Sequence, residues 1–302
     1  MVSNKRVSFK IILTILRVIL QFINVVIILS LIASHFVIKE RTFWSSLFFY
    51  GFPLPVIIVV VLALTLFLTK QWRRYNLIIA SVLLLIWLSK SFKVHIPDTI
   101  KETDLEVVFW NASRENTFEL AFNENGDIPN VMVLVESPEN DIEKFKQKYP
   151  NYYFYKSDRE LFIFSKTAID IKSENTSKYG TTVIDFKTAG VGFYAVDVQG
   201  STDVPREWEL NFVNKSIKRK DNTIVLGDFN TPYESIYLKQ LKTDFNQAFN
   251  KKGNGFRETW FYNIPLLSLD HIWVSKDLKI LKSEKIFTTK SDHSILKTFI
   301  EH

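Results

Sequence analysis

A run of almost wholly apolar residues from Phe9 to Phe36 constrains this chain more than any other stretch of its sequence. Arg17 and Gln21 interrupt it only near its start, so it is long enough to cross a hydrocarbon layer of about 30 Å. A cleaved signal peptide is the alternative, but the run is too long for the apolar region of such a peptide, and its small-residue cleavage site is unconvincing. We therefore expect a transmembrane helix.

Two further apolar runs follow, at Phe43–Thr69 and Tyr75–Leu88. Gly51 and Pro53 lie inside the first of these runs, where they would kink a helix without excluding it from a membrane. The second run is short for a span, so it would depend on aromatic and basic residues at its ends. We predict about three spans, which form an all-α membrane domain.

Basic residues around these runs predict the orientation of the chain. Residues 1–94 carry eleven Lys and Arg against the single acid Glu40, a net charge of +10. The bases concentrate before Phe9 and between the two later apolar runs, and basic flanks of this kind stay in the cytoplasm. The N-terminus is therefore predicted inside and, after three crossings, residues 95–302 outside. This describes a multi-pass membrane protein whose domain 95–302 is extracytoplasmic.

The charge of residues 95–302 narrows the classes of partner. Their 27 bases and 31 acids give a net charge of −4, so the pI of 9.2 reflects the membrane flanks. The usual inference from a basic chain to a nucleic-acid partner therefore fails for this domain, although a basic cluster over 215–220 keeps it open. The chain has no cysteine, which excludes disulfides and thiolate metal sites.

Short β-rich runs separated by polar, helix-forming stretches begin at Leu105. Strands are predicted at 105–110, 131–135, 152–155, 161–164, 181–187, 191–198, 224–226, 269–274, 282–288 and 295–300, and helices at 142–149, 205–218 and 235–249. This mixed order with several hairpins favours an α/β two-layer β-sandwich with outer helices over a doubly wound parallel sheet. The sequence contains no dinucleotide-binding fingerprint, Walker A motif or nucleophile elbow.

The stretch Asn222–Glu234, NTIVLGDFNTPYE, carries the clearest sign of chemistry. Its short apolar run ends at Gly227, which allows a close backbone approach. Asp228 and Asn230 are two residues apart on an extended chain and so point to one side. A carboxylate beside a neutral amide suits a phosphoryl site, where one orders a water or a metal and the other donates to an equatorial oxygen. An ordinary turn after a strand is the alternative.

Five more polar residues stand where these two would need partners. They are Asn111, Glu136, Asp270, Asp292 and His293. Each alone has an ordinary structural explanation, such as a solvated surface or a satisfied strand end. Their joint placement at or just beyond strand ends in one α/β domain instead predicts a single site.

From about Leu105 to Ile300, these motifs resemble the endonuclease/exonuclease/phosphatase superfamily, which has the DNase-I-like fold. Their order is F-W-N, L-V-E, F-S-K, G-D-F-N, L-D-H-I and S-D-H, of which GDFN and the terminal SDH are the most specific. The resemblance implies a divalent-metal-dependent hydrolase of phosphoric esters, whether phosphatase, phosphodiesterase or nuclease.

The resemblance also implies ligands for a metal and for a phosphate. Glu136 would be the main metal ligand, assisted by Asp292, while Asn111 and Asn230 would contact the phosphate. An oxygen-rich site without cysteine selects Mg²⁺, with Mn²⁺ and Ca²⁺ as alternatives. Zinc is the poorer choice, because His271 directly follows an aspartate on a strand and should face away from it.

Proton transfer falls to three other residues in this resemblance. Asp228 would orient or deprotonate the attacking water, and His293, oriented by Asp270, would hydrogen-bond the phosphate or pass a proton.

Gln199 is expected to bind substrate, but it stands where the superfamily usually has a histidine that contacts the scissile phosphate. Because a glutamine carries no proton at neutral pH, this departure favours a good leaving group such as a pyrophosphate.

A second segment, Gly253–Leu269, resembles the corresponding stretch of membrane-anchored bacterial members of the superfamily. This would place Arg257, Trp260 and Tyr262 near the rim of the site. Ordinary packing of an aromatic loop is the alternative.

Three functions are compatible with the sequence. The first is a membrane-anchored phosphoesterase that acts outside the cytoplasm on a phosphate ester or pyrophosphate, with a lipid-linked substrate favoured by the tether. The second is a membrane-tethered nuclease, for which the net charge of −4 is a difficulty. The third is a non-catalytic membrane-tethered binding module. No obligate protein partner is evident.

Overall fold

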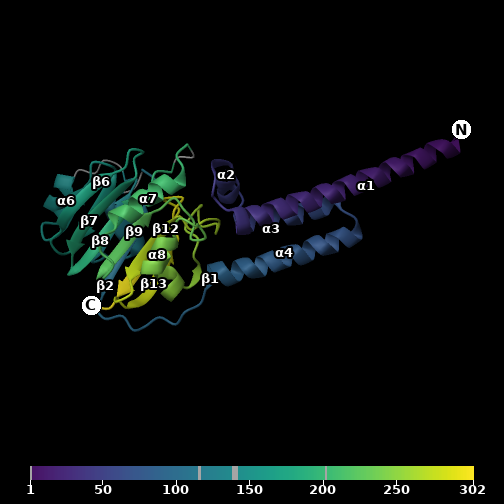
Figure 1. The fold of residues 1–302 in the computed structure, drawn as a ribbon. Coiled ribbons are helices and arrows are strands. Elements are labelled where there is room, and N and C mark those ends of the chain that lie inside the picture. The colour runs from purple at the N-terminus through teal and green to yellow at the C-terminus, as the bar shows by residue number, and fades with distance from the viewer. Residues whose placement is uncertain (1, 115–116, 138–141, 201–202) are drawn as a thin grey trace. The chain divides into compact units, whose positions relative to one another are not determined.

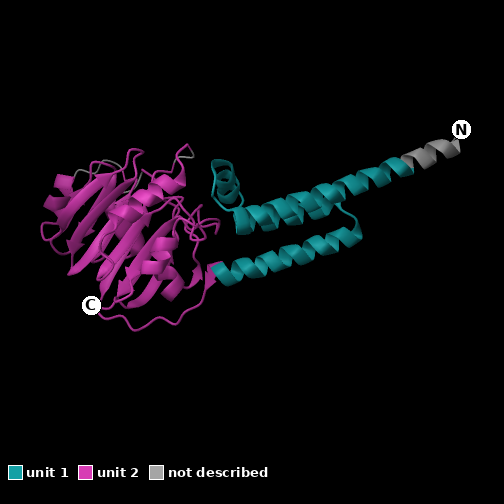
Figure 2. Cartoon of the chain, in the orientation of Figure 1, with its two compact units in different colours: residues 1–90 teal, residues 91–302 magenta. Residues whose placement is uncertain are grey.

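The structure is a computed structural model that describes residues 2–114, 117–137, 142–200 and 203–302 (Figure 1). The chain divides into two compact units, Met1–Lys90 and Ser91–His302, which Figure 2 shows in different colours. The sequence-based limits, 1–94 and 95–302, stay a prediction of which residues belong to the membrane domain and which to the catalytic domain.

The first unit consists of helices. Its elements are α1 (Val2–Ala33), a π-helical turn (Ser34–Ile38), α2 (Phe43–Gly51), α3 (Leu54–Leu64), a 3₁₀ turn (Thr65–Phe67) and α4 (Lys70–Ser91). Residues 10–38 and α4 are each long and apolar enough to cross a membrane. Helices α2 and α3 would supply a third span only as a pair bent by 74°. The break between them contains Pro53, whose ring and missing N–H stop a helix.

Helices α1, α3 and α4 pack around a pair of buried amides. Asn24 and Asn76 donate to each other's side-chain oxygens at 3.1 and 2.8 Å, which satisfies polar groups that an apolar medium would penalise. The outer surface of this unit is also apolar, with Phe22 and Leu66 among its exposed side chains. A helical unit that is apolar both inside and outside is typical of a membrane domain.

The second unit is a sandwich of two six-stranded sheets. The first sheet has the order β13 (Ile280–Ile286), β14 (Ile295–Ile300), β2 (Leu105–Asn111), β3 (Val131–Val135), β5 (Leu161–Ser165) and β4 (Tyr153–Lys156). The second has the order β10 (Phe245–Gln247), β12 (Asp270–Ser275), β9 (Thr223–Asp228), β8 (Val191–Asp197), β7 (Thr182–Thr188) and β6 (Asp170–Thr176). The pairs β2–β3 and β8–β9 are parallel, and the other pairs in these sheets are antiparallel. The predicted two-layer α/β fold is confirmed.

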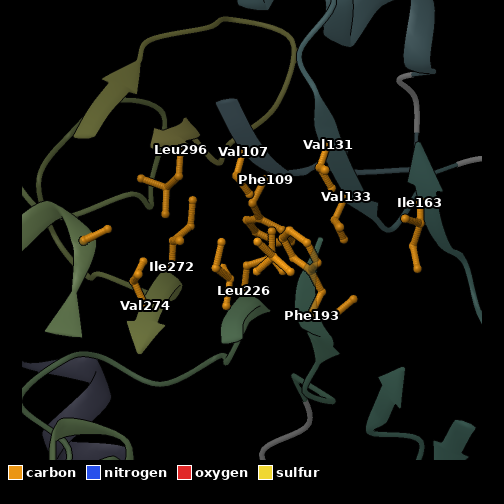
Figure 3. Packing of buried hydrophobic residues seen from close by; sticks show 14 of the residues in the cluster. Val107, Phe109, Val131, Val133, Ile163, Phe193, Leu226, Ile272, Val274 and Leu296 are labelled. Carbon is orange, nitrogen blue, oxygen red and sulfur yellow. The ribbon is translucent and has the colours of Figure 1, made fainter. Parts of the chain in front are cut away.

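The core between the two sheets positions the site. It is built from alternate residues of the central strands, among them Phe109 of β2, Phe193 of β8 and Leu226 of β9 (Figure 3). Successive side chains of a strand point to opposite faces of its sheet. A residue two positions after the last apolar core residue of a strand therefore points to the same inner face. Helices cover the outer faces: α7 (Arg206–Ser216) and α8 (Lys239–Asp244) on the second sheet, α5 (Phe118–Asn125) and α6 (Ile142–Lys148) on the first.

Gly227 permits the close approach that its sequence position predicts. A β-carbon at Gly227 would lie 1.8 Å from the carbonyl oxygen of Val196 on the neighbouring strand β8. A larger residue would therefore push β8 and β9 apart next to Asp228.

The structure corrects the helix predicted over 235–249. That segment contains only the short α8, then strand β10, then α9 (Ala248–Lys252). Phe245 and Gln247 of β10 pair with the edge of β12, so strand pairing there outweighs a helical sequence pattern. Strand β6 and helix α5 were not predicted. For β6 the reason is that it is a polar edge strand without alternating apolar residues.

A two-stranded ribbon joins the start of the second unit to a later segment. Strand β1 (Phe92–Lys93) follows α4 directly and pairs with β11 (Gly255–Phe256). The segment after β11 leads to Trp260 and then to β12, and so toward the site.

Candidate active site

Polar residues continue the inner faces of three strands at one edge of the sandwich. Asn111 follows Phe109 in the alternation of β2, and Asp228 follows Leu226 in that of β9. Asp270, the first residue of β12, is the antiparallel partner of Asp228. Asn111 Nδ2 donates to Asp228 Oδ2 at 2.9 Å, a bond that joins the two sheets. Three buried polar side chains therefore meet at one end of the core.

Glu136 joins this group through Asn111. Its Oε1 lies 3.4 Å from Asn111 Nδ2, and Arg114 Nη2 lies 3.6 Å from its Oε2. Glu136 follows β3 with a left-handed backbone, φ 49°, and its side chain is 29% exposed. It therefore offers a carboxylate to a ligand that enters from solvent.

His293 and Asp270 form a buried ion pair. His293 Nδ1 donates to Asp270 Oδ2 at 2.8 Å. Burial alone would lower the pKa of His293, but the charge and hydrogen bond of Asp270, with Asp228 and Asp292 nearby, raise this pKa to about 10. The ring is therefore an imidazolium at neutral pH.

Asp228 titrates near neutrality. Burial and the charge of Asp270 raise its pKa to about 7, against the opposing effects of His293 and of hydrogen bonds from Asn230 and Asn111. The backbone N–H of Asn230 donates to Asp228 Oδ1 at 2.7 Å. A carboxylate that gains and loses a proton in this range suits a general base.

Asn230 lies beside Asp228 as predicted, but its amide is already engaged. Its backbone is left-handed, φ 46°, and its Nδ2 donates to the carbonyl oxygen of Val198 at 2.7 Å. The same nitrogen carries a second hydrogen, which is the one suited to a phosphoryl oxygen.

Asp292 lies in the β13–β14 loop and is held by two donors. Ser113 Oγ donates to Oδ1 at 2.6 Å, and Trp260 Nε1 donates to Oδ2 at 2.8 Å. Burial would raise the pKa of Asp292, but these hydrogen bonds and the charge of His293 lower it below its ordinary value. Ser113 N also donates to Asn111 Oδ1 at 3.0 Å, so Asp292 belongs to the same network.

Gln199, which the sequence analysis expects to bind substrate, lies two residues beyond the end of β8. Its backbone N–H donates to Thr181 Oγ1 at 3.0 Å, and its exposed side chain lies against Gly180. In the parallel β8–β9 pair, the residue opposite Asp228 is Asp197. Asp197 therefore lies beside Asp228, and the substrate-binding role of Gln199 stays a prediction.

Asp197 is the residue that sequence reasoning missed. Phe193 and Ala195 of β8 point into the core, and Asp197 is the next residue in the same alternation. The signal in the sequence was therefore an acid at a position where the alternation predicts an apolar core residue. Burial raises the pKa of Asp197 well above its ordinary value, and the negative charges of Asp228 and Glu136 raise it further.

His271 faces away from the site, as its alternation with Asp270 predicts. Its Nε2 lies 3.0 Å from the carbonyl oxygen of Thr231, and its ring contacts Phe229 and Trp273. Burial lowers its pKa to about 4, so the ring is neutral and structural. This removes one nitrogen ligand from any zinc site here.

The donor set at this edge fits a hard divalent cation. Ligand atoms of Asp228, Asp270 and His293 lie within 4.8 Å of one another. His293 already donates to Asp270, which leaves carboxylate oxygens as the main donors. Asp270 Oδ1 is buried and has no hydrogen-bond partner among the described residues. Burial and the charge of Asp270 raise the pKa of Asp228, so a cation would stabilise the ionised form of this carboxylate.

Solved structures share this fold at low identity. An AP endonuclease from Archaeoglobus fulgidus superposes with a TM-score of 0.52 at 16% identity, over 64% of this chain and 98% of that one. An endonuclease/exonuclease/phosphatase from Bacteroides vulgatus gives 0.51 at 17%, over 66% and 99%. A 3′ phosphatase from Neisseria, bound to a product DNA hairpin, gives 0.50 at 17%, over 64% and 98%. These identities establish the fold alone.

A comparison with curated proteins gives no match. The model of the Endonuclease/Exonuclease/phosphatase family, however, matches residues 96–293, which is more than half of the chain and spans Asn111 to His293. Members of this family are metal-dependent phosphoester hydrolases, such as nucleases and phosphatases. The chain belongs to the Endonuclease/Exonuclease/phosphatase family.

Proposed function

We propose that this protein is a membrane-anchored hydrolase of a phosphate ester or pyrophosphate, lipid-linked in its natural substrate, with its catalytic unit outside the cytoplasm. The observation that carries the proposal is the meeting of two hydrogen-bonded groups: Asn111 donates to both Glu136 and Asp228, and Asp270, the strand partner of Asp228, accepts from His293. Together they bring a base, an imidazolium and accessible carboxylate oxygens to one edge of both sheets.

Asp228 acts as the base in this proposal. Its oxygens are fixed by donors from Asn111 and from the backbone of Asn230, which leaves it oriented to accept a proton from water. Its pKa of about 7 keeps a useful fraction ionised at neutral pH. His293, charged through Asp270, donates a hydrogen bond to a phosphoryl oxygen or a proton to the leaving group.

Glu136, with Asp292, would hold a Mg²⁺ ion beside the cluster of Asp228, Asp270 and His293, because both belong to the hydrogen-bond network of Asn111 and Ser113. Oxygen ligands favour Mg²⁺ over zinc. A bound Mg²⁺ supplies positive charge that offsets the negative charge developing on the phosphoryl oxygens.

The first unit supports the membrane attachment. Two of its helices have the length and hydropathy of spans, and a bent pair could form a third. With three crossings and basic flanks inside, residues beyond α4 lie outside the cytoplasm.

The basic cluster that favoured a nuclease is partly neutralised. Arg219 pairs with Asp185 at 2.6 Å, and Lys220 pairs with Asp244 at 2.8 Å. The cluster also lies before the first residue of β9, whereas Asp228 is the last residue of that strand. At the ordinary rise of a strand, the length of β9 separates the two by about 17 Å. This supports a substrate that does not need a long basic track for its phosphates.

A membrane-tethered nuclease is the second candidate, because the Neisseria neighbour is bound to a DNA product. The experiment is a panel in which full-length protein in proteoliposomes with Mg²⁺ receives a polyprenyl pyrophosphate, an inositol phosphate, RNA and plasmid DNA. We expect fastest turnover of the lipid pyrophosphate. Faster degradation of plasmid DNA would replace the proposal by the nuclease, and turnover of none would favour a binding module.

Glu136→Gln is the matched variant for that panel. An amide keeps the shape of the side chain but loses the charge that holds a hard cation, so we expect a loss of turnover of at least about 100-fold at limiting Mg²⁺. Glu160, an exposed acid that also pairs with Arg114, supplies the control variant Glu160→Gln. Equal activity of both variants would count against Glu136 as the metal ligand.

A further inference from the structure

Four large apolar side chains are exposed on two loops beside the candidate active site. They are Phe261 (37% exposed), Tyr262 (55%), Ile264 (54%) and Phe287 (62%), which we call the apolar rim. The loop that carries the first three has no charged residue from Thr259 to Leu269. Exposed apolar groups gathered at one place are typical of a surface that binds another phase or another molecule.

The apolar rim is held in place by hydrogen bonds, so its exposure is a property of the fold. Thr259 N donates to Leu267 O at 3.0 Å, which closes the first loop as a hairpin. Asn263, at the tip of this loop, donates from Nδ2 to the carbonyl oxygen of Thr288 at 3.1 Å. Because Thr288 follows Phe287, this bond fixes the two loops side by side.

The same two loops hold the active site. Tyr262 N donates to the carbonyl oxygen of Asp292 at 2.9 Å, and Trp260 Nε1 donates to the carboxylate of Asp292 at 2.8 Å. Phe287 opens the β13–β14 loop, which carries Asp292 and His293. Whatever binds the apolar rim therefore lies next to the catalytic residues.

The segment that leads to the apolar rim is bonded to the first residue of the second unit. Arg257 N donates to the carbonyl oxygen of Ser91, with which that unit begins, at 3.0 Å. Phe261 is four residues after Arg257, so it lies at most about 14 Å along the chain from that point. Arg257 is buried and paired with Glu234, which anchors this attachment. If α4 crosses a membrane, the apolar rim starts within reach of the bilayer surface.

We propose that the apolar rim docks into the interface of the lipid bilayer to which the chain is attached and holds the active site at the level of phosphate headgroups. Aromatic side chains that combine an apolar ring with a polar atom, as Tyr262 does, favour that interface. The proposal rests on the proposed function, in that it takes α4 as a span and a membrane-borne phosphate as the substrate.

The absence of cysteine allows a direct test of bilayer contact in the full-length protein. Ile264→Cys and Phe287→Cys are each labelled with an environment-sensitive fluorophore, and Trp208→Cys on α7, also exposed at 52%, is the matched control. The proteins are reconstituted in vesicles of phosphatidylcholine and phosphatidylglycerol that carry doxyl-labelled lipid. We expect a blue shift and strong quenching at positions 264 and 287, and neither at position 208.

Three outcomes of this labelling would overturn the proposal. Quenching at 264 and 287 equal to that at 208 would mean that the apolar rim does not touch lipid. Energy transfer between copies labelled at 264, without lipid quenching, would mean that a second copy covers it. A blue shift without lipid quenching would mean that another part of the protein covers it.

Turnover separates this proposal from the function on which it rests. The triple variant Phe261→Ser/Ile264→Ser/Phe287→Ser should raise KM for a vesicle-borne polyprenyl pyrophosphate about tenfold, while hydrolysis of soluble bis(p-nitrophenyl) phosphate stays unchanged. Trp208→Ser should change neither. Equal losses on both substrates would make the rim merely structural and overturn the proposal. Lipid quenching without any turnover would refute the proposed function and leave the bilayer contact standing.

Discussion

Asp270→Asn is expected to change the proton affinity of His293 while keeping the shape of the site. Asp270 Oδ2 accepts from His293 Nδ1 at 2.8 Å, and both side chains are buried. Against burial, the charge and hydrogen bond of Asp270 are the largest causes that raise the pKa of His293 to about 10. With a neutral amide in its place, this pKa should fall toward the ordinary value of about 6.5.

The consequence for catalysis depends on the sign of this shift. A proton donor works below its pKa, so wild-type turnover should persist until the pH approaches about 10. In the variant, turnover should decline as the pH rises through about 6.5. Near pH 8 the protonated fraction would be about 3%, which predicts a loss of roughly 30-fold that shrinks as the pH falls.

Two measurements check this reasoning on the reconstituted full-length protein. The first is the pH–rate profile of kcat at saturating Mg²⁺, and the second is an NMR titration of labelled histidine rings. His271, whose pKa burial lowers to about 4, should stay neutral in both proteins and serves as the internal control. An imidazolium at His293 that survives above about pH 9 in the variant, or a loss of rate that is equal at every pH, would refute it.

Two other changes have simpler expected outcomes. Asp197→Asn should keep kcat within about threefold, because an amide can donate a hydrogen bond as a protonated carboxyl does. Asp197→Leu cannot donate one, so its kcat should fall at least about tenfold. A larger loss of kcat in the asparagine variant than in the leucine variant would contradict this. Ser173→Cys, at an exposed position of β6, should react with an impermeant thiol reagent in intact cells, and protection would contradict the outward orientation.

Much of the sandwich could be predicted from its buried strands, because apolar runs of four to seven residues bounded by turn residues are a local signal. Val131–Val135 and Ile295–Ile300 form the strands that the sequence predicts, residue for residue. Strand β6 carries no such signal: its residues are mostly polar and it pairs only at the edge with β7. Pairing with an existing edge, which stabilised β10 as well, depends on the partner strand and is not visible in a local window.

The polar cluster could be predicted for a related reason. Asn111, Asp228 and Asp270 each follow or begin a buried strand, and polar residues there must find partners once the strands assemble. What the sequence does not contain is the register between strands. The β9–β12 register places Asp270 opposite Asp228, and only this pairing explains why the pKa of Asp228 is raised by a neighbouring charge.

Register also explains why the sequence did not reveal Asp197. The strand predicted to run to Val198 placed this acid inside an apolar run, but β8 ends at Asp197, opposite Asp228 in the sheet. An ionised carboxylate there would repel a phosphate, whereas a protonated one donates a hydrogen bond as a histidine would. The raised pKa of Asp197 favours the second state and weakens the argument that this site requires a leaving group needing no protonation. The proposed preference for a membrane-borne substrate therefore depends less on Gln199 than on three other features. These are the proposed membrane attachment, the paired basic cluster that precedes β9 and the apolar rim beside Asp292.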